Sequence, residues 1–406
     1  IRDWSDLSVP TQERLRAQFR TSVLPILTPL AVDSEHPFPF ISTGGLNLAV
    51  VMPGDDPSDE RFVRIKVPGN RPRFVDVPDG GYCPLEQIIV ANLDLLFPSS
   101  PPARVHLFRV TRGAEGPVTR SADLDDAEQA RRPGAIVRQV TDELKARKFA
   151  GVVRLEVDDA MPGPLRTWLA AQLDIHADDV YATRNLLKLS DLTAFADRPH
   201  GAHRYAPHIP VTHPRLAQVH GSAPGAIFEE IRRGDILLHH PYHSFDTSVV
   251  RFLEAAAADP TVLAIKVTIY RTSADSPIVK ALIDASRQGK QVAVLVEINA
   301  RFDEAPNIAW GRLLEQEGVH VSYGVERLKT HVKLILVVRE EGDEVRRYAH
   351  VGTGNYHTGT ARVYEDLGIL TCHPEICEDV SKVFVELTGA TGAHEYSRML
   401  VAPRFM

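Results

Sequence analysis

The stretch KTHVKLILVV, residues 329–338, decides how the second half of this chain folds and where its chemistry lies. Residues 334–338 are all apolar and, with Lys333, predict a buried β-strand. Because side chains alternate along a strand, His331 and Lys333 point the same way at its mouth. There an imidazole nitrogen can lie beside an anion that the ammonium holds. An exposed His–Lys pair at a strand end, without a chemical role, is the alternative.

Length and composition set the class of protein. The chain has 406 residues, 44% hydrophobic and 24% charged, enough for two or three globular domains. It contains no apolar run of membrane-spanning length, and its net charge of -7 argues against general nucleic-acid binding. The cysteines, Cys83, Cys372 and Cys377, form neither a zinc nor a disulfide pattern, so we expect a cytoplasmic protein, with a peripheral position at the inner membrane left open. Ile1 follows no leader, from which we expect no targeting segment and an incomplete gene product.

The first half predicts an α+β head domain over residues 21–215, after a lead-in helix at 1–20. Its basic residues, Arg61, Arg64, Lys66, Arg109 and Arg112, lie on predicted strands beside acidic neighbours, which indicates a solvated sheet face. We find no catalytic constellation there. Residues 193–225 hold several histidines and prolines. Their irregular spacing favours a linker over a metal site.

The second half predicts an α/β domain, residues 216–398, with a mixed, mainly parallel sheet. Predicted strands begin at residues 262, 291 and 319, with a helix before each of the last two. Ser276 caps the first of these helices, Pro277 takes its first position and Gly289 ends it. The strand of His331 follows no helix, so we expect it to run antiparallel. Glu341–Asp343 then forms a hairpin turn.

Polar residues converge on one edge of this predicted sheet, which we call the rim. Parallel strands end there, and ligands of open α/β sheets bind there. The rim collects Arg271, Arg301, His331, Lys333, the loop Gly352–Asn355 and Arg362. Arginine forks match phosphate oxygens, and glycine-rich turns let backbone N–H groups approach phosphate. A neutral histidine can attack phosphorus. The rim therefore predicts an anion or phosphate site.

Motifs along almost the whole chain resemble those of bacterial polyphosphate kinases. The matching blocks are Leu24–Val32, His36–Pro39, Phe108–Arg112, Asp235–Tyr242, Tyr270–Ser273, Ala300–Glu304, Lys329–His331, Gly352–Tyr356 and Thr360–Arg362. Two positions depart from the related patterns: Val338 replaces the aspartate of phospholipase D, and His357 replaces a frequent asparagine.

The resemblance implies a phospholipase-D-like core in which the γ-phosphate of ATP phosphorylates His331. Arg271 and Arg301 match the family's phosphate and Mg²⁺ site. A guanidinium has no lone pair for a metal, so we expect both arginines to act through phosphate. The remaining candidate residues for ATP and phosphate binding are Lys333, Asn355, Arg362 and Tyr364, of which Tyr364 matches a nucleotide-contacting tyrosine.

The leading hypothesis is thus a polyphosphate kinase, a transferase that moves the ATP γ-phosphate reversibly to polyphosphate through a phosphohistidine. The resemblance also implies a homo-oligomer, a further domain before Ile1, and a second phospholipase-D-like domain that residues 399–406 begin. Whether this chain turns over alone stays open. The alternatives are a phosphodiesterase of phospholipase D type, acting through His331, and a non-catalytic polyphosphate-binding fragment.

Overall fold

A computed structural model describes most of the chain. The described ranges are residues 1–33, 35–54, 60–113, 137, 140–141, 149–184, 186–196, 205–219, 223–270, 272, 276–298, 304–324, 329–389 and 395–403. The chain divides into two compact units, one of residues 1–120 with 143–204, the other of residues 121–142 with 205–406. Within the described ranges, no helix has both the length and the apolar character needed to cross a bilayer.

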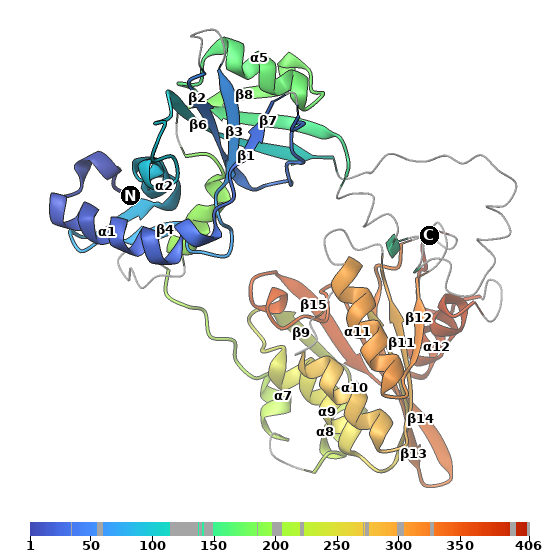
Figure 1. Cartoon of the computed structure of the whole chain (residues 1–406). Coiled ribbons are helices and arrows are strands. Elements are labelled where there is room, and N and C mark those ends of the chain that lie inside the picture. The colour runs from blue at the N-terminus through green and yellow to red at the C-terminus, as the bar shows by residue number, and fades with distance from the viewer. Residues whose placement is uncertain are drawn as a thin grey trace, which may run out of the picture. The chain divides into compact units, whose positions relative to one another are not determined.

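Unit 1 is built on a six-stranded sheet with the order β1-β3-β2-β6-β7-β8 (Figure 1). Its pairs are antiparallel except β7 with β8. The strands are β1 (Leu30–Val32), β2 (Leu46–Met52), β3 (Arg61–Lys66), β6 (Arg104–Arg112), β7 (Val152–Asp158) and β8 (Val180–Thr183), and β4 (Phe74–Asp76) with β5 (Tyr82–Pro84) forms a separate hairpin. The α+β character predicted for this half is confirmed.

Helices pack on both faces of the unit 1 sheet. Leu15 and Phe19 of α1 join Ile88 of α2 in one core, and Leu169 of α5 lies in the other. The helices are α1 (Val9–Ser22), α2 (Leu85–Ala91), α5 (Gly163–Gln172) and α6 (Thr193–Ala196), with short 3₁₀ turns η1 (Trp4–Asp6), η2 (Leu24–Ile26), η3 (Leu93–Leu95), η4 (Ala177–Asp179) and η5 (Leu189–Leu192). A buried Arg73–Glu86 ion pair, 2.5 Å long, ties the β4–β5 hairpin to α2.

Unit 2 is built on a seven-stranded sheet with the order β12-β11-β10-β13-β14-β15-β9. The strands are β9 (Ile236–His240), β10 (Val262–Ile269), β11 (Gln291–Val296), β12 (His320–Tyr323), β13 (Lys333–Glu341), β14 (Glu344–Gly352) and β15 (Asp366–Thr371). The mixed sheet is confirmed, and β10, β11 and β12 are parallel as predicted. The predicted excess of parallel pairs is wrong: β10–β13, β13–β14, β14–β15 and β15–β9 are all antiparallel. Strands β9 and β15, which the pattern did not predict, account for two of these pairs.

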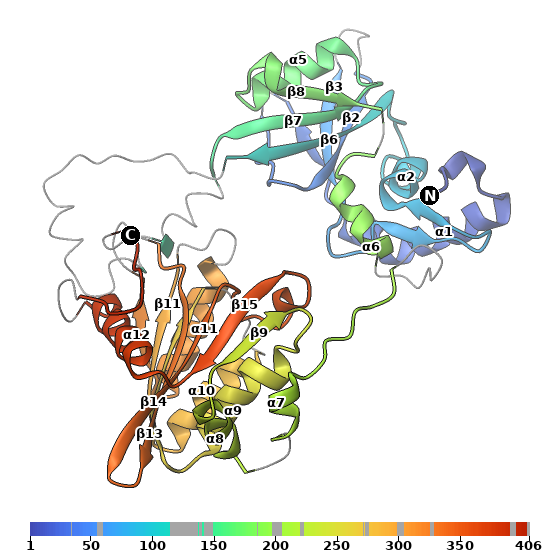
Figure 2. The ribbon, with the colours of Figure 1, turned by 180° about the vertical axis from the view of Figure 1, so that it is seen from behind.

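Helices cover both faces of this sheet. Helix α12 lies on one face and packs on Leu334, Leu336 and Ala349, whereas α8 to α11 lie on the other (Figures 1 and 2). The helices are α7 (Pro214–Ala217), α8 (Ala226–Arg232), α9 (Arg251–Ala258, after a π-helical turn at Asp246–Val250), α10 (Pro277–Arg287), α11 (Glu304–Gln316) and α12 (Pro374–Leu387), with a 3₁₀ turn η8 (Thr360–Arg362). Ser276 caps α10 through its hydroxyl, which accepts a hydrogen bond from Ile278 N.

Three predicted segments differ from the structure or lie partly outside the residues that it describes. The spacing of the apolar residues in 84–97 predicts one helix, but the α-helix ends at Ala91 and the chain continues only as the 3₁₀ turn η3. Residues 123–149 are charged and predict a mostly helical stretch, most of which lies outside the described residues. Residues 197–204 and 220–222 of the predicted linker lie outside them as well.

Candidate active site

His331 and Lys333 lie together at the N-terminal end of β13, on the rim. The His331 side chain is exposed, whereas Lys333 is only 3% exposed. Lys333 Nζ lies 3.1 Å from His331 Nδ1 and also donates a hydrogen bond to the His331 carbonyl oxygen. The Tyr270 ring meets the His331 ring edge-on, with centroids 5.0 Å apart. The structure therefore brings an accessible imidazole directly beside a buried ammonium.

Burial and charge set the protonation of this pair. Partial burial, helped by the positive charges of Lys333 and Lys329, lowers the pKa of His331 below its usual 6.5, which favours the neutral ring near pH 7. Burial also lowers the pKa of Lys333 to about 8, against an opposing effect of the Asp366 carboxylate. A neutral imidazole keeps the lone pair that a nucleophile needs.

The glycine-rich loop follows β14 at the same rim. Thr353 closes it onto β15: its backbone N–H donates to Leu367 O (2.9 Å), and its hydroxyl donates to Asp366 Oδ1 (2.8 Å). A Cβ on Gly354 would come within 2.5 Å of Asp366 Oδ2, so this close approach requires glycine. Asn355, further along the loop, has a buried Oδ1 without a hydrogen-bond partner among the described residues.

The other predicted site residues are less tightly gathered. Arg362, on η8, is exposed and pairs with Asp246 at 2.9 Å. Tyr364 is 62% exposed. Arg271 and Arg301 lie outside the described residues. Thus His331 and Lys333 are in contact, and Asn355 lies on the loop that Asp366 helps to hold.

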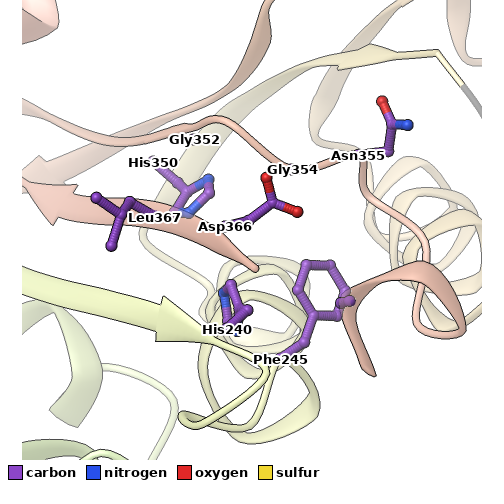
Figure 3. Close-up of a pocket in the computed structure, with 9 residues that line it drawn as sticks. His240, Phe245, His350, Gly352, Gly354, Asn355, Asp366 and Leu367 are labelled. Atoms are coloured by element: carbon purple, nitrogen blue, oxygen red, sulfur yellow. The ribbon is translucent and has the colours of Figure 1, made fainter. Parts of the chain in front are cut away.

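The sequence did not reveal a small cavity on the rim that β9, β14 and β15 enclose. His240, His350 and Asp366 lie around it (Figure 3). Its volume of about 10 Å³ approaches that of one water molecule. The Nε2 atoms of His240 and His350 are buried and have no hydrogen-bond partner in the described part of the chain. They are therefore the groups that a bound water would satisfy.

The His350 ring is held in place by buried protein groups and has almost no contact with solvent. It is 2% exposed, its Nδ1 lies 2.8 Å from the Tyr356 hydroxyl, and burial lowers its pKa to about 3, so the ring stays neutral. Its imidazole occupies the space above two cross-strand partners, Gly352 and Gly368. A glycine inside a strand can mark such a close approach, but only the strand register shows that Gly352 and Gly368 are neighbours.

Adding a methyl group at Gly368 tests this packing. Its Cβ would lie 2.5 Å from His350 Nε2, so Gly368→Ala should lower the free energy of unfolding by about 1–3 kcal/mol. Urea unfolding measures the change. Gly151→Ala is the control, because a Cβ there meets nothing within 4 Å. In a His350→Ala background, Gly368→Ala should cost almost nothing; an undiminished cost there would contradict the proposed contact.

Among the described residues, nothing indicates a metal ion held by the protein alone at this site. Within the described ranges, no group of three or more His, Cys, Asp or Glu side chains could hold a metal ion. The described residues therefore do not fit a protein-held Mg²⁺, whose preferred ligands are oxygens.

Comparison with known proteins identifies the family. Residues 11–195 match the family model described as the polyphosphate kinase middle domain, and residues 226–393 match that of polyphosphate kinase C-terminal domain 1. The chain belongs to the polyphosphate kinase family. This confirms the family resemblance that the motifs indicated.

Individual members of the polyphosphate kinase family cover nearly the whole chain. Polyphosphate kinases of Mycobacterium ulcerans and Mycobacterium tuberculosis are 48% and 47% identical over 413 and 417 residues, each covering 98% of this chain and 54% of the relative. The crystal structure of polyphosphate kinase from Porphyromonas gingivalis aligns with a TM-score of 0.76 and 28% identity, over 96% of this chain and 56% of that one. The chain thus spans about half the length of the relatives it matches.

Proposed function

We propose that this chain carries the phosphate-accepting site of a polyphosphate kinase, and that His331 is its nucleophile. The observation that carries the proposal is the His331–Lys333 pair, in which an exposed imidazole of lowered pKa lies 3.1 Å from a buried ammonium. The ring nitrogen forms a bond to the γ-phosphorus of ATP while the bond from phosphorus to the bridging oxygen breaks, and ADP leaves. Phosphate then passes from the histidine to polyphosphate, and the reverse route makes ATP.

The surrounding residues take supporting roles in this proposal. Lys333 neutralises charge on the transferred phosphate. Asn355, Arg362 and Tyr364 contact the nucleotide or phosphate chain, and Arg271 and Arg301 hold phosphate oxygens. Mg²⁺ would arrive bound to those phosphates and lower their charge.

We propose that residues 216–398 form the catalytic domain and that residues 21–215 form a supporting head domain. The substrates, ATP or ADP and polyphosphate, suggest a cytoplasmic enzyme. Following the family resemblance, we propose that the full-length protein is a homo-oligomer. A phosphodiesterase would use the same histidine but transfer to water, so the acceptor separates the two functions.

A labelling experiment tests the proposed function. The full-length protein is incubated with Mg²⁺ and ATP that carries a radioactive γ-phosphate. We expect protein-bound label that is labile in acid and stable in base, as phosphohistidine is. Adding ADP or polyphosphate should remove the label into ATP or longer polyphosphate. Absence of label, or its release only as inorganic phosphate whatever acceptor is added, would overturn the kinase proposal.

A further inference from the structure

A buried set of hydrogen bonds reaches the backbone on both sides of His331. We call Thr268, Glu297, Asn307, Trp310 and Thr330 the rim network. All five side chains are buried, with exposed fractions of 2%, 1%, 0%, 2% and 7%. They come from β10, the end of β11, α11 and the segment before β13. None of them belongs to the candidate phosphate-binding residues described above.

Asn307 joins the ends of two parallel strands. Its Nδ2 donates to Tyr270 O, just after β10, and to Glu297 O, just after β11, both at 2.9 Å. Its Oδ1 accepts from Trp310 Nε1 at 3.0 Å. Because an indole can only donate, this contact fixes which end of the amide faces the carbonyls. Asn307 therefore sets the spacing of these strand ends at the rim.

Glu297 extends the rim network to the residue that precedes His331. Its Oε2 accepts a hydrogen bond of 2.6 Å from Thr330 N. A short bond from a backbone N–H to a carboxylate is stronger than one between neutral groups. The Thr330 backbone is thereby anchored on the β11 side of the sheet.

Thr268 anchors the other side of His331. The β10–β13 ladder extends toward the rim only as far as Val267 and Ile335. Beyond it, the Thr268 hydroxyl donates to Val332 O (2.8 Å) and accepts from Leu334 N (2.9 Å). One side chain thus replaces two ladder bonds. His331 lies between this anchor and the Glu297 anchor, although its own side chain is exposed.

We propose that Glu297 and Thr268 are positioning residues that hold His331 for attack on phosphorus, with Asn307 fixing the backbone of Glu297. This inference rests on the proposed function. An exposed histidine outside the strand ladder would otherwise move with its backbone. In-line transfer tolerates little displacement, since a shift of about 1 Å can cost about 100-fold in rate. Neither Glu297 nor Thr268 need touch the substrate.

Two pairs of variants test the inference in the full-length protein. Glu297→Ala and Thr268→Val remove the anchors, whereas Glu297→Gln and Thr268→Ser keep an acceptor or a hydroxyl in place. The readouts are the single-turnover rate of His331 labelling and the dissociation constant of ATP. Ser286→Ala is the matched control, because it removes a similar bond, 2.9 Å to Glu317 O, near the far end of α11.

We expect Glu297→Ala and Thr268→Val to slow labelling by about 10- to 100-fold while ATP affinity changes by less than about threefold. The Gln and Ser variants should stay within about fivefold of the wild type, as should Ser286→Ala. Rates are expressed per folded molecule, from circular dichroism of each sample, so that lost folding is not counted as lost positioning.

Three outcomes would overturn the inference. The first is a wild-type labelling rate in both Glu297→Ala and Thr268→Val. The second is a labelling rate that falls as far in Glu297→Gln as in Glu297→Ala. The third is a labelling rate that falls as far in Ser286→Ala as in the anchor-removing variants. If one variant does not fold, the other pair still decides, because the two anchors act independently on opposite sides of His331. A wild-type protein that takes up no label would instead contradict the proposed function.

Discussion

Replacing His331 with alanine is expected to abolish the acid-labile label and to lower polyphosphate synthesis by about 10,000-fold or more. Removing a nucleophile leaves only binding and charge stabilisation, and losses of this size follow in other enzymes that form covalent intermediates. Alanine at this position also removes the ring contacts with Tyr270 and Lys333. Labelling with γ-labelled ATP and steady-state synthesis of polyphosphate measure the two effects.

His320→Ala is the matched control for this prediction. His320 is an exposed histidine at the start of β12, in the same sheet, and pairs with Ala293. It should label and turn over like the wild type. If His331→Ala still carries a base-stable label, a different histidine accepts the phosphate and the assignment of the nucleophile is wrong.

Replacing Lys333 with methionine is expected to slow phosphate transfer by about 100- to 1,000-fold while making the fold more stable at pH 7. The kinetic loss reflects removal of a preorganised cation from the site of charge development. The gain in stability arises because burial lowers the pKa of Lys333 from 10.5 to about 8, so the folded state holds a charge there at a cost. Methionine fills similar space without charge.

The sign of the stability change depends on pH. Between about 8 and 10.5 the unfolded chain keeps the Lys333 proton and the folded chain has lost it, so stability of the wild type rises with pH across this window. Below about pH 8, the buried charge of Lys333 lowers the free energy of unfolding by its full amount, up to about 3 kcal/mol. Urea unfolding should therefore show Lys333→Met as more stable at pH 7, with the difference shrinking toward pH 10.5. A variant less stable at pH 7 would contradict this account.

The same lysine should shape the pH dependence of activity. In the free enzyme, kcat/KM for ATP should fall as pH rises through about 8, because Lys333 loses its charge. At acid pH, below the usual histidine pKa of 6.5, kcat/KM should also fall, because His331 becomes protonated there. Lys333→Met should lose the alkaline decline and keep the acid one. We therefore expect Lys333 to lower the stability of the fold and to raise the rate of phosphate transfer.

Local sequence rules predicted much of the secondary structure of the second unit. Ser276, Pro277 and Gly289 bound α10 as predicted, because capping and chain reversal depend on residues that are neighbours in sequence. The alternation of residues 333–338 placed Lys333 and Leu334 on opposite faces of β13, since the period of a strand is local too. The motifs along almost the whole chain were enough to indicate the family.

Tertiary structure alone decided the strand pairing and the surroundings of His331. Strands β9 and β15 join the sheet beside β14 through contacts between residues far apart in sequence, which turns its pairing mainly antiparallel. The same pairing stacks Gly352 against Gly368 and opens the space that His350 fills. Glu297 and Thr268 had no local signal, since each acts on backbone atoms of a distant segment. The sequence by itself determined that His331 is the residue we propose as the nucleophile. Only the folded chain holds the backbone on both sides of it, because the hydrogen bonds of Glu297, Thr268 and Asn307 join segments that are distant in sequence.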